Sequence, residues 1–276
     1  MTPLVDTHCH LALLEDRGLL DQAMESAAEA GVEQVVSVGL DVDDSDRNRQ
    51  LAERFSGVYF TVGWHPHKPA PPDTAQLAAL DELLRHPRAV AVGEIGLDAY
   101  WRPGYHDTPL EVQRTGLRLM LELAAAHGKP VVIHDRDAHA EVLDELSSWR
   151  DRGGVPEQPL GVMHCFSGDA EVAVRVVALG MLCSFAGTVT FPRSDAVQDA
   201  ARTLDAGAIV VETDAPFLAP VPHRGRPNLP GYVADTAAAV ARLRGVDAAS
   251  FAAQTTANAR RLFSLHDGVV DAAATH

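Results

Sequence analysis

Residues 110–134 contain one complete unit of the pattern that decides the fold, LEVQRTGLRLMLELAAAHGKPVVIH. Apolar residues recur at helical spacing over residues 110–127, and Gly128 then supplies a helix stop signal. Residues 130–134 form a short apolar run without strict alternation, which is typical of a strand buried on both faces. The segment therefore predicts a helix followed by an inner strand.

Similar apolar runs occur eight times, separated by stretches with helical periodicity. The runs are residues 4–7, 34–39, 58–63, 89–94, 130–134, 160–164, 180–185 and 208–212. Helices are predicted at residues 16–30, 73–85, 110–127, 137–149, 169–179, 230–243 and 250–262. In a chain of 276 residues, this alternation favours an α/β fold, a TIM-type (β/α)8 barrel in a single domain. On pattern alone, an open doubly wound sheet stays an alternative.

Composition and charge narrow the class of protein. Hydrophobic residues make up 46% and charged residues 22% of the chain, which excludes general disorder. The formal net charge of −15 argues against a protein that coats duplex nucleic acid, although a cleft can still hold local cations. We expect a barrel over residues 1–265 and a disordered tail over residues 266–276.

The sequence also sets expectations about location. We find no apolar run long enough to span a bilayer, and residues 1–10 lack the features of a secretory signal. Three cysteines are too few for a disulfide framework, so we expect reduced thiols in a cytoplasmic protein. We expect it to be a monomer without a membrane partner.

Imidazoles and carboxylates stand at or just beyond the C-terminal ends of five predicted strands. They are His8, His10, Glu94, His134, His164 and Asp214. The C-terminal ends of barrel strands converge on one face, and these side chains are transition-metal ligands by chemical type. A lone histidine at a strand end is more often a hydrogen-bonded cap, but six such residues on one face favour a metal site.

The size of this set indicates how many ions it would hold. One catalytic zinc ion needs about three protein ligands, whereas two ions about 3.5–4 Å apart would use all six. The strand of Glu94 lies between the two groups of ligands, so Glu94 is the expected bridge. His8, His10 and Asp214 would then hold one divalent ion, and His134 and His164 the other. Mg²⁺, Mn²⁺ and Zn²⁺ are all candidates.

Six motifs resemble those of the TatD family of metal-dependent deoxyribonucleases, within the amidohydrolase superfamily. They are DTHCHL at residues 6–11, GWHPH at 63–67, GEIGLD at 93–98, VIHDR at 132–136, HCFSG at 164–168 and ETDAPFL at 212–218. The resemblance implies a TIM-type barrel that hydrolyses DNA phosphodiester bonds, with the same six residues at the metal-binding positions. It further implies a 3′–5′ exonuclease on single-stranded DNA, with RNA as a possible substrate.

One loop departs from the family pattern. The family usually has an Arg-Gly-Lys-x-Asn-Glu-Pro-like segment where residues 224–230 read RGRPNLP. Arg226 keeps the positive charge of the lysine but changes the hydrogen-bond geometry, and Leu229 replaces an acid. This departure concerns the choice of substrate rather than the metal site.

We assign catalytic roles to Asp214, which would orient a water and take its proton, and to Glu94 as the bridge. Asp6 and Glu212 should share the barrel interior and position the ligands. Five side chains could contact substrate: Arg136, His65, His67, Arg224 and Arg226. A surface salt bridge from Arg136 to Asp135 or Asp137 is equally consistent with the sequence. His65 and His67 could equally serve as hydrogen-bonded caps.

Two other functions fit the sequence. The same metals could serve a hydrolase of small amides, lactones or phosphoesters, and the net charge of −15 mildly favours this alternative. A metal-binding scaffold without turnover is the third, but the complete set of candidate ligands argues against it. Cationic and aromatic side chains at the barrel mouth are the feature that separates nuclease from small-molecule hydrolase.

Overall fold

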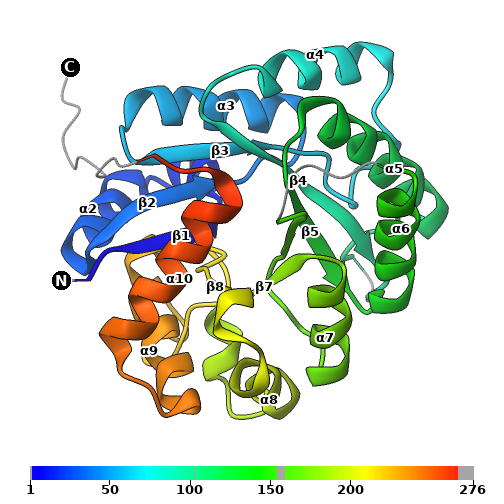
Figure 1. Ribbon diagram of the computed structural model, residues 1–276. Coiled ribbons are helices and arrows are strands. Elements are labelled where there is room, and N and C mark those ends of the chain that lie inside the picture. The colour runs from blue at the N-terminus through cyan, green and yellow to red at the C-terminus, as the bar shows by residue number, and fades with distance from the viewer. Residues whose placement is uncertain (1, 103, 154–158, 267–276) are drawn as a thin grey trace.

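A computed structural model, describing residues 2–102, 104–153 and 159–266, has eight parallel strands surrounded by helices (Figure 1). The strands are β1 (Leu4–Cys9), β2 (Val32–Ser37), β3 (Val58–Val62), β4 (Ala89–Asp98), β5 (Val131–Arg136), β6 (Gly161–Met163), β7 (Met181–Phe185) and β8 (Ile209–Val211). Neighbours in sequence are neighbours in the sheet, from β1 to β8. This order confirms the barrel and rules out the doubly wound alternative, whose strand order reverses at a switch point.

Backbone contacts between β8 and β1 nearly close the sheet at its C-terminal end. The Asp214 N–H donates to the His8 carbonyl at 2.9 Å, and the His10 N–H donates to the Ala215 carbonyl at 2.8 Å. Cys9 and Ala215 form an isolated parallel bridge. The residues that close the barrel are therefore also residues of the predicted metal site.

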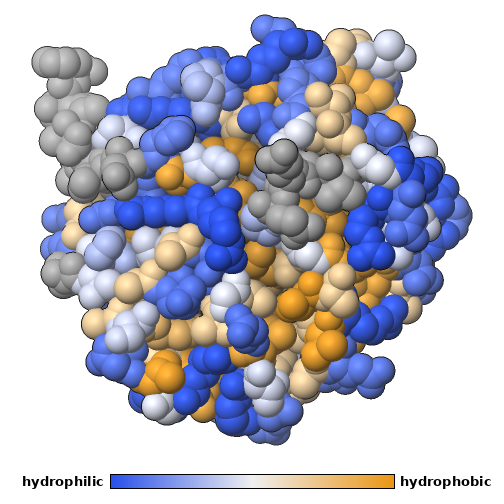
Figure 2. Space-filling model, in the orientation of Figure 1, coloured by the Kyte–Doolittle hydropathy of each residue, from blue (hydrophilic) through white to orange (hydrophobic). Residues whose placement is uncertain are grey.

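Ten α-helices are present among the described residues. They are α1 (Leu11–Asp16), α2 (Leu20–Ala30), α3 (Val42–Arg54), α4 (Thr74–Leu84), α5 (Leu110–His127), α6 (His139–Asp151), α7 (Ala170–Ala178), α8 (Asp195–Thr203), α9 (Val233–Arg244) and α10 (Ala248–Phe263). Hydrophilic residues cover much of the outer helices in the view of Figure 2, whereas hydrophobic residues are exposed between them, towards the barrel. None of the described helices is both long and apolar enough to cross a membrane.

The core has two parts, one inside the barrel and one between strands and helices. The inner part contains one or two residues from each strand, such as Val5, Val36 and Val210, together with Leu262 and Phe263 of α10. The end of α10 therefore covers the N-terminal opening of the barrel, and the opposite opening is left for the site. The expected tail begins at His266, whose carbonyl accepts a hydrogen bond from Gln34 at 2.6 Å; residues 267–276 lie outside the described residues.

The helix predictions needed two corrections. The helix expected at residues 16–30 begins only at Leu20, as α2, because the chain turns at Gly18, whose φ is +67°; the short helix α1 before this turn was not predicted. Helices α3 and α8 were not predicted from the sequence. Helix α3 buries Ser45 and Asn48 beside Leu51 and Ala52, so it has no apolar stripe, and α8 buries only Ala200 and Ala201.

Candidate metal centre

The six predicted residues meet around Glu94, at the C-terminal opening of the barrel. His8 lies on β1 and His134 on β5, while His10, His164 and Asp214 follow β1, β6 and β8 directly or within three residues. Glu94 lies inside β4, where the pairing with β5 shifts between Val92 and Ile95. Such a bulge changes the direction of a side chain. Strand β4 ends at Asp98, four residues beyond the end expected at Glu94.

The two carboxylate oxygens of Glu94 face different histidines. Oε1 lies 2.7 Å from His134 Nδ1 and 2.9 Å from His164 Nε2. Oε2 lies 3.5 Å from His8 Nε2 and 4.0 Å from His10 Nε2. Glu94 thus separates the side chains into the two groups expected from the sequence.

Asp214 completes the group around Glu94 Oε2. Its Oδ1 lies 3.2 Å from His10 Nε2 and 3.8 Å from His8 Nε2. Asp214 has a left-handed backbone, with φ of +58°, a conformation that aspartate tolerates better than most residues. Its carboxylate is 12% exposed, against 3% for Glu94, so it is the more accessible acid of the pair.

Glu212 and Asp6 were expected to position ligands, and only Glu212 contacts a candidate ligand ring. Its Oε1 lies 3.3 Å from His164 Nδ1 and accepts the Cys165 N–H at 2.8 Å. Asp6 accepts hydrogen bonds from the backbone N–H of Thr213 at 2.8 Å and from its hydroxyl at 2.6 Å. Asp6 therefore fixes the end of β8, and burial raises its pKa to about 8.

Burial and neighbouring histidines together set the protonation of Glu94, Asp214 and His65. Burial alone would raise the pKa of Glu94, but His164 and His65 beside it hold that pKa well below the usual range. Burial likewise opposes ionisation of Asp214, and the hydrogen bond from His10 outweighs it and lowers the pKa. For His65, burial is the largest effect and lowers the pKa to about 4. Both acids are thus carboxylates near neutral pH, as metal ligands need to be.

A cleft of about 920 Å³ opens over this centre. Arg136, His65 and His67, three of the five side chains expected to contact substrate, line it. Arg136 packs over the ring of Tyr100 at 4.0 Å and donates to the Tyr105 hydroxyl at 2.7 Å. Arg224 lies over the Phe191 ring, 3.8 Å from its centre, and Arg226 is exposed; neither is among the residues that line the cleft.

The sequence prediction omitted residues beside the centre that also carry metal-ligand atoms. Asp98, at the end of β4, lies 2.8 Å from His67 Nε2 and 3.2 Å from His134 Nε2. His106, on the loop before α5, lies 3.7 Å from Asp98. Asp98 could have been found, because positions i and i+4 of a strand share a face and Glu94 is four residues earlier.

The donor set fits divalent metal ions. Three groups of potential ligands around Glu94 have their donor atoms within 4.8 Å of one another: His8, His10 and Glu94; Glu94, His134 and His164; and His8, His164 and Asp214. Both ring nitrogens of the fully buried His8 lack a hydrogen-bond partner among the described residues. Buried imidazoles are normally hydrogen-bonded or bound to metal, so these residues could hold a metal ion.

Comparison with known proteins agrees with the barrel fold and identifies the family of the chain. The family model of TatD related DNase matches residues 5–264. A relative from Mycobacterium tuberculosis, named an uncharacterized metal-dependent hydrolase, is 39% identical over 95% of this chain and 98% of its own. The 3′-5′ ssDNA/RNA exonuclease TatD of Klebsiella pneumoniae is 33% identical over 89% of this chain and 92% of its own. The crystal structure of a TatD homologue from Escherichia coli, YjjV, has a TM-score of 0.86 and 30% identity, covering 95% of this chain and 98% of that one.

Fold, site and relatives together define a metal-dependent hydrolase built on a β/α barrel. The chain belongs to the TatD family.

Proposed function

We propose that the protein is a deoxyribonuclease that shortens single-stranded DNA from its 3′ end, using two divalent ions. The proposal is carried by the contacts of the two Glu94 carboxylate oxygens. Oε1 faces His134 and His164, whereas Oε2 faces His8 and His10. A carboxylate in this position suits a bridge between two ions. His8, His10 and Asp214 would hold one ion, and His134 and His164 the other. We include a cytoplasmic location in the proposal, consistent with the three free thiols.

The chain's own residues supply binding, orientation and proton transfer. Bound divalent ions would make an attacking water more acidic and neutralise charge on the phosphate. Asp214 is the proposed base, because its carboxylate is ionised and the more accessible of the two acids. Glu212 orients His164.

Cationic and aromatic side chains support a nucleic-acid substrate. Arg102 and Arg136 line the cleft and pack against the Tyr105 ring, each 5.0 Å from its centre. A guanidinium held on an aromatic ring is suited to a phosphate, and we assign this contact to Arg136. His65 and His67 lie on the same wall and are proposed to contact substrate. Arg224 and Arg226 remain candidates only for a strand that extends beyond the cleft.

The test is a nuclease assay on protein stripped with a chelator. A 5′-labelled single-stranded DNA is incubated with Mg²⁺, Mn²⁺ or Zn²⁺ added singly, and an RNA of the same sequence is run beside it. We expect metal-dependent, stepwise shortening of the label-bearing strand. Glu94→Gln should lower the rate by roughly a hundredfold or more, because it removes charge at the centre. Glu53→Gln, the same substitution at an exposed carboxylate of α3, is the matched control.

The label also distinguishes the alternatives. Immediate release of labelled mononucleotide would indicate digestion from the 5′ end and contradict the proposed polarity. Intact DNA and RNA with every metal, from protein that still binds metal, would exclude the nuclease and leave hydrolysis of small esters or amides. Equal activity of Glu94→Gln and wild type would point to a contaminating nuclease.

A further inference from the structure

Beside the Glu94 centre lies a second group of metal-ligand side chains, which we call the outer cluster: His67, Asp98 and His106. His67 follows β3, Asp98 ends β4, and His106 lies on the loop before α5, so three separate segments contribute. The donor atoms of the three residues lie within 4.8 Å of one another. None of the three belongs to the two-ion centre proposed above.

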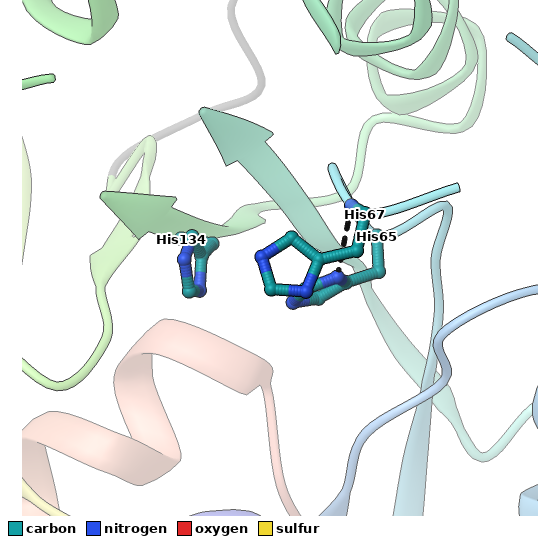
Figure 3. A group of neighbouring side chains, drawn as sticks. All are labelled: His65, His67 and His134. Carbon is teal, nitrogen blue, oxygen red and sulfur yellow. Dashed lines mark hydrogen bonds between the residues drawn. The ribbon is translucent and has the colours of Figure 1, made fainter. Parts of the chain in front are cut away.

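Figure 3 shows His67 of the outer cluster near His134 of the Glu94 centre. The ring of His134, from β5, faces those of His65 and His67, from the loop after β3. His134 Nδ1 lies 2.7 Å from Glu94, whereas its Nε2 lies 3.2 Å from Asp98. One imidazole therefore connects the two groups through its two nitrogens, and Asp98 belongs to the outer one.

The distances around Asp98 are compatible with shared metal ligation, although His67 and His134 hydrogen-bond to Asp98 in the absence of an ion. Two ligands of a tetrahedral zinc ion, each about 2.0–2.2 Å from it, lie about 3.3 Å apart. The nearest nitrogens of His67, His134 and His106 lie 2.8, 3.2 and 3.7 Å from the carboxylate of Asp98.

The side chain of His106 is largely buried, although its ring nitrogens form no hydrogen bonds with the described residues. Its side chain is 9% exposed, and neither ring nitrogen has a hydrogen-bond partner among the described residues. Its ring stacks on His67, with centres 4.2 Å apart. Burial of an imidazole with both nitrogens unpaired is unfavourable, and a metal ligand bond is one way to satisfy it.

Arg136 reaches the outer cluster only through the hydroxyl of Tyr105. Arg136 donates to the Tyr105 hydroxyl, and that hydroxyl donates to Asp98 at 3.1 Å. Asp98 is fully buried, with a side-chain exposure of 0%, yet no arginine or lysine contacts it directly among the described residues. A buried carboxylate surrounded by imidazoles is a favourable site for a divalent cation.

We propose that His67, Asp98 and His106 bind a third divalent cation, with Zn²⁺ or Mn²⁺ as the ions that suit two imidazoles and one carboxylate. This ion is separate from the pair at Glu94 and does not depend on which substrate the enzyme cleaves. Because His134 contacts Asp98, the third ion also holds the ring of His134 in the orientation that faces Glu94.

The proposal is tested by counting ions. Chelator-stripped protein is dialysed against micromolar Zn²⁺, or Mn²⁺ in a parallel series, and bound metal is measured by mass spectrometry together with protein concentration. We expect three ions per chain for the wild type and two for His106→Ala and His106→Gln. Circular dichroism and urea unfolding verify that each variant is folded.

Two further variants separate this proposal from the two-ion centre. His139→Ala removes a histidine of α6 that pairs with Asp135 outside both groups, and it should keep all three ions. Glu94→Gln should lose ions at the main centre but keep the one that His106→Ala removes. Equal metal content in wild type and folded His106 variants would overturn the third site and leave the two-ion nuclease untouched. Loss of all ions in the His106 variants would also overturn a separate site.

Discussion

At the scale of single residues, the centre depends on carboxylates that orient imidazoles as well as on those that face the ions. Glu212 is buried and contacts both the His164 ring and the N–H of Cys165. The sequence predicted Glu212 because it lies two residues before Asp214. It could not show that the similarly placed Asp6 bonds Thr213 instead of the His8 ring. That difference depends on the position of side chains across β1 and β8, which no local pattern encodes.

We expect Glu212→Gln to weaken metal binding about 10–100-fold, because His164 loses the carboxylate that fixes its ring. Competition titration of Zn²⁺ against a chromophoric chelator measures the effect. The urea midpoint of the metal-free protein gives an independent measure of folding, and Glu53→Gln is the control. Unchanged zinc affinity in a folded Glu212→Gln protein would remove Glu212 from the site.

His139 makes a pH-dependent contribution to stability. Its Nδ1 lies 2.6 Å from Asp135, and this hydrogen bond raises the pKa of His139. A histidine with a raised folded-state pKa stabilises the protein fully below its unfolded pKa of about 6.5, and the contribution is lost as pH rises through the folded value. His139→Gln should therefore destabilise the protein more at about pH 5.5 than at about pH 9. Urea unfolding with a chelator present measures this, and an equal loss at both pH values would contradict it.

At the scale of elements, all eight strands were predicted within a few residues, because buried parallel strands are continuous apolar runs. Helix α3 escaped prediction because its buried face contains Asn48, which donates to the Val38 carbonyl at 3.2 Å rather than packing as an apolar side chain. His106 escaped because it lies in a loop, where periodicity carries no information. Tertiary contacts rather than local preference place both residues: a hydrogen bond for Asn48 and ring stacking on His67 for His106.

Helix α10 closes the barrel end opposite the site, and its last turn should contribute strongly to stability. Phe263 is 2% exposed and belongs to the inner core with Val5 and Val36. Phe263→Ala should lower the free energy of unfolding by about 3–5 kcal/mol, through lost burial and a residual cavity. Val246→Ala, at a valine that is 47% exposed, should change it by less than about 0.5 kcal/mol. Urea unfolding of both variants measures these changes in the free energy of unfolding. An equally small change for Phe263→Ala and Val246→Ala would show that α10 does not seal the core.

At the scale of the whole molecule, one face of the barrel carries the chemistry, while the chain as a whole has a net negative charge. The net charge of −15 repels a polyanion at long range, so the cleft itself must attract it. Lys68, Arg102 and Arg136 line that cleft, above a centre whose proposed ions add further positive charge. The fold and the six central residues followed from sequence, whereas the grouping of His67 and Asp98 with the loop residue His106 needed coordinates.

The proposed hydrolysis depends on a pair of divalent ions bridged by Glu94. The most direct measurement is anomalous diffraction from crystals of the protein grown with Mn²⁺. Besides any peak at the outer cluster, it should show two peaks about 3.5–4 Å apart, one near His8 and His10 and one near His134 and His164, with the Glu94 carboxylate between them. A single peak beside Glu94, or none there, would contradict the bridged pair.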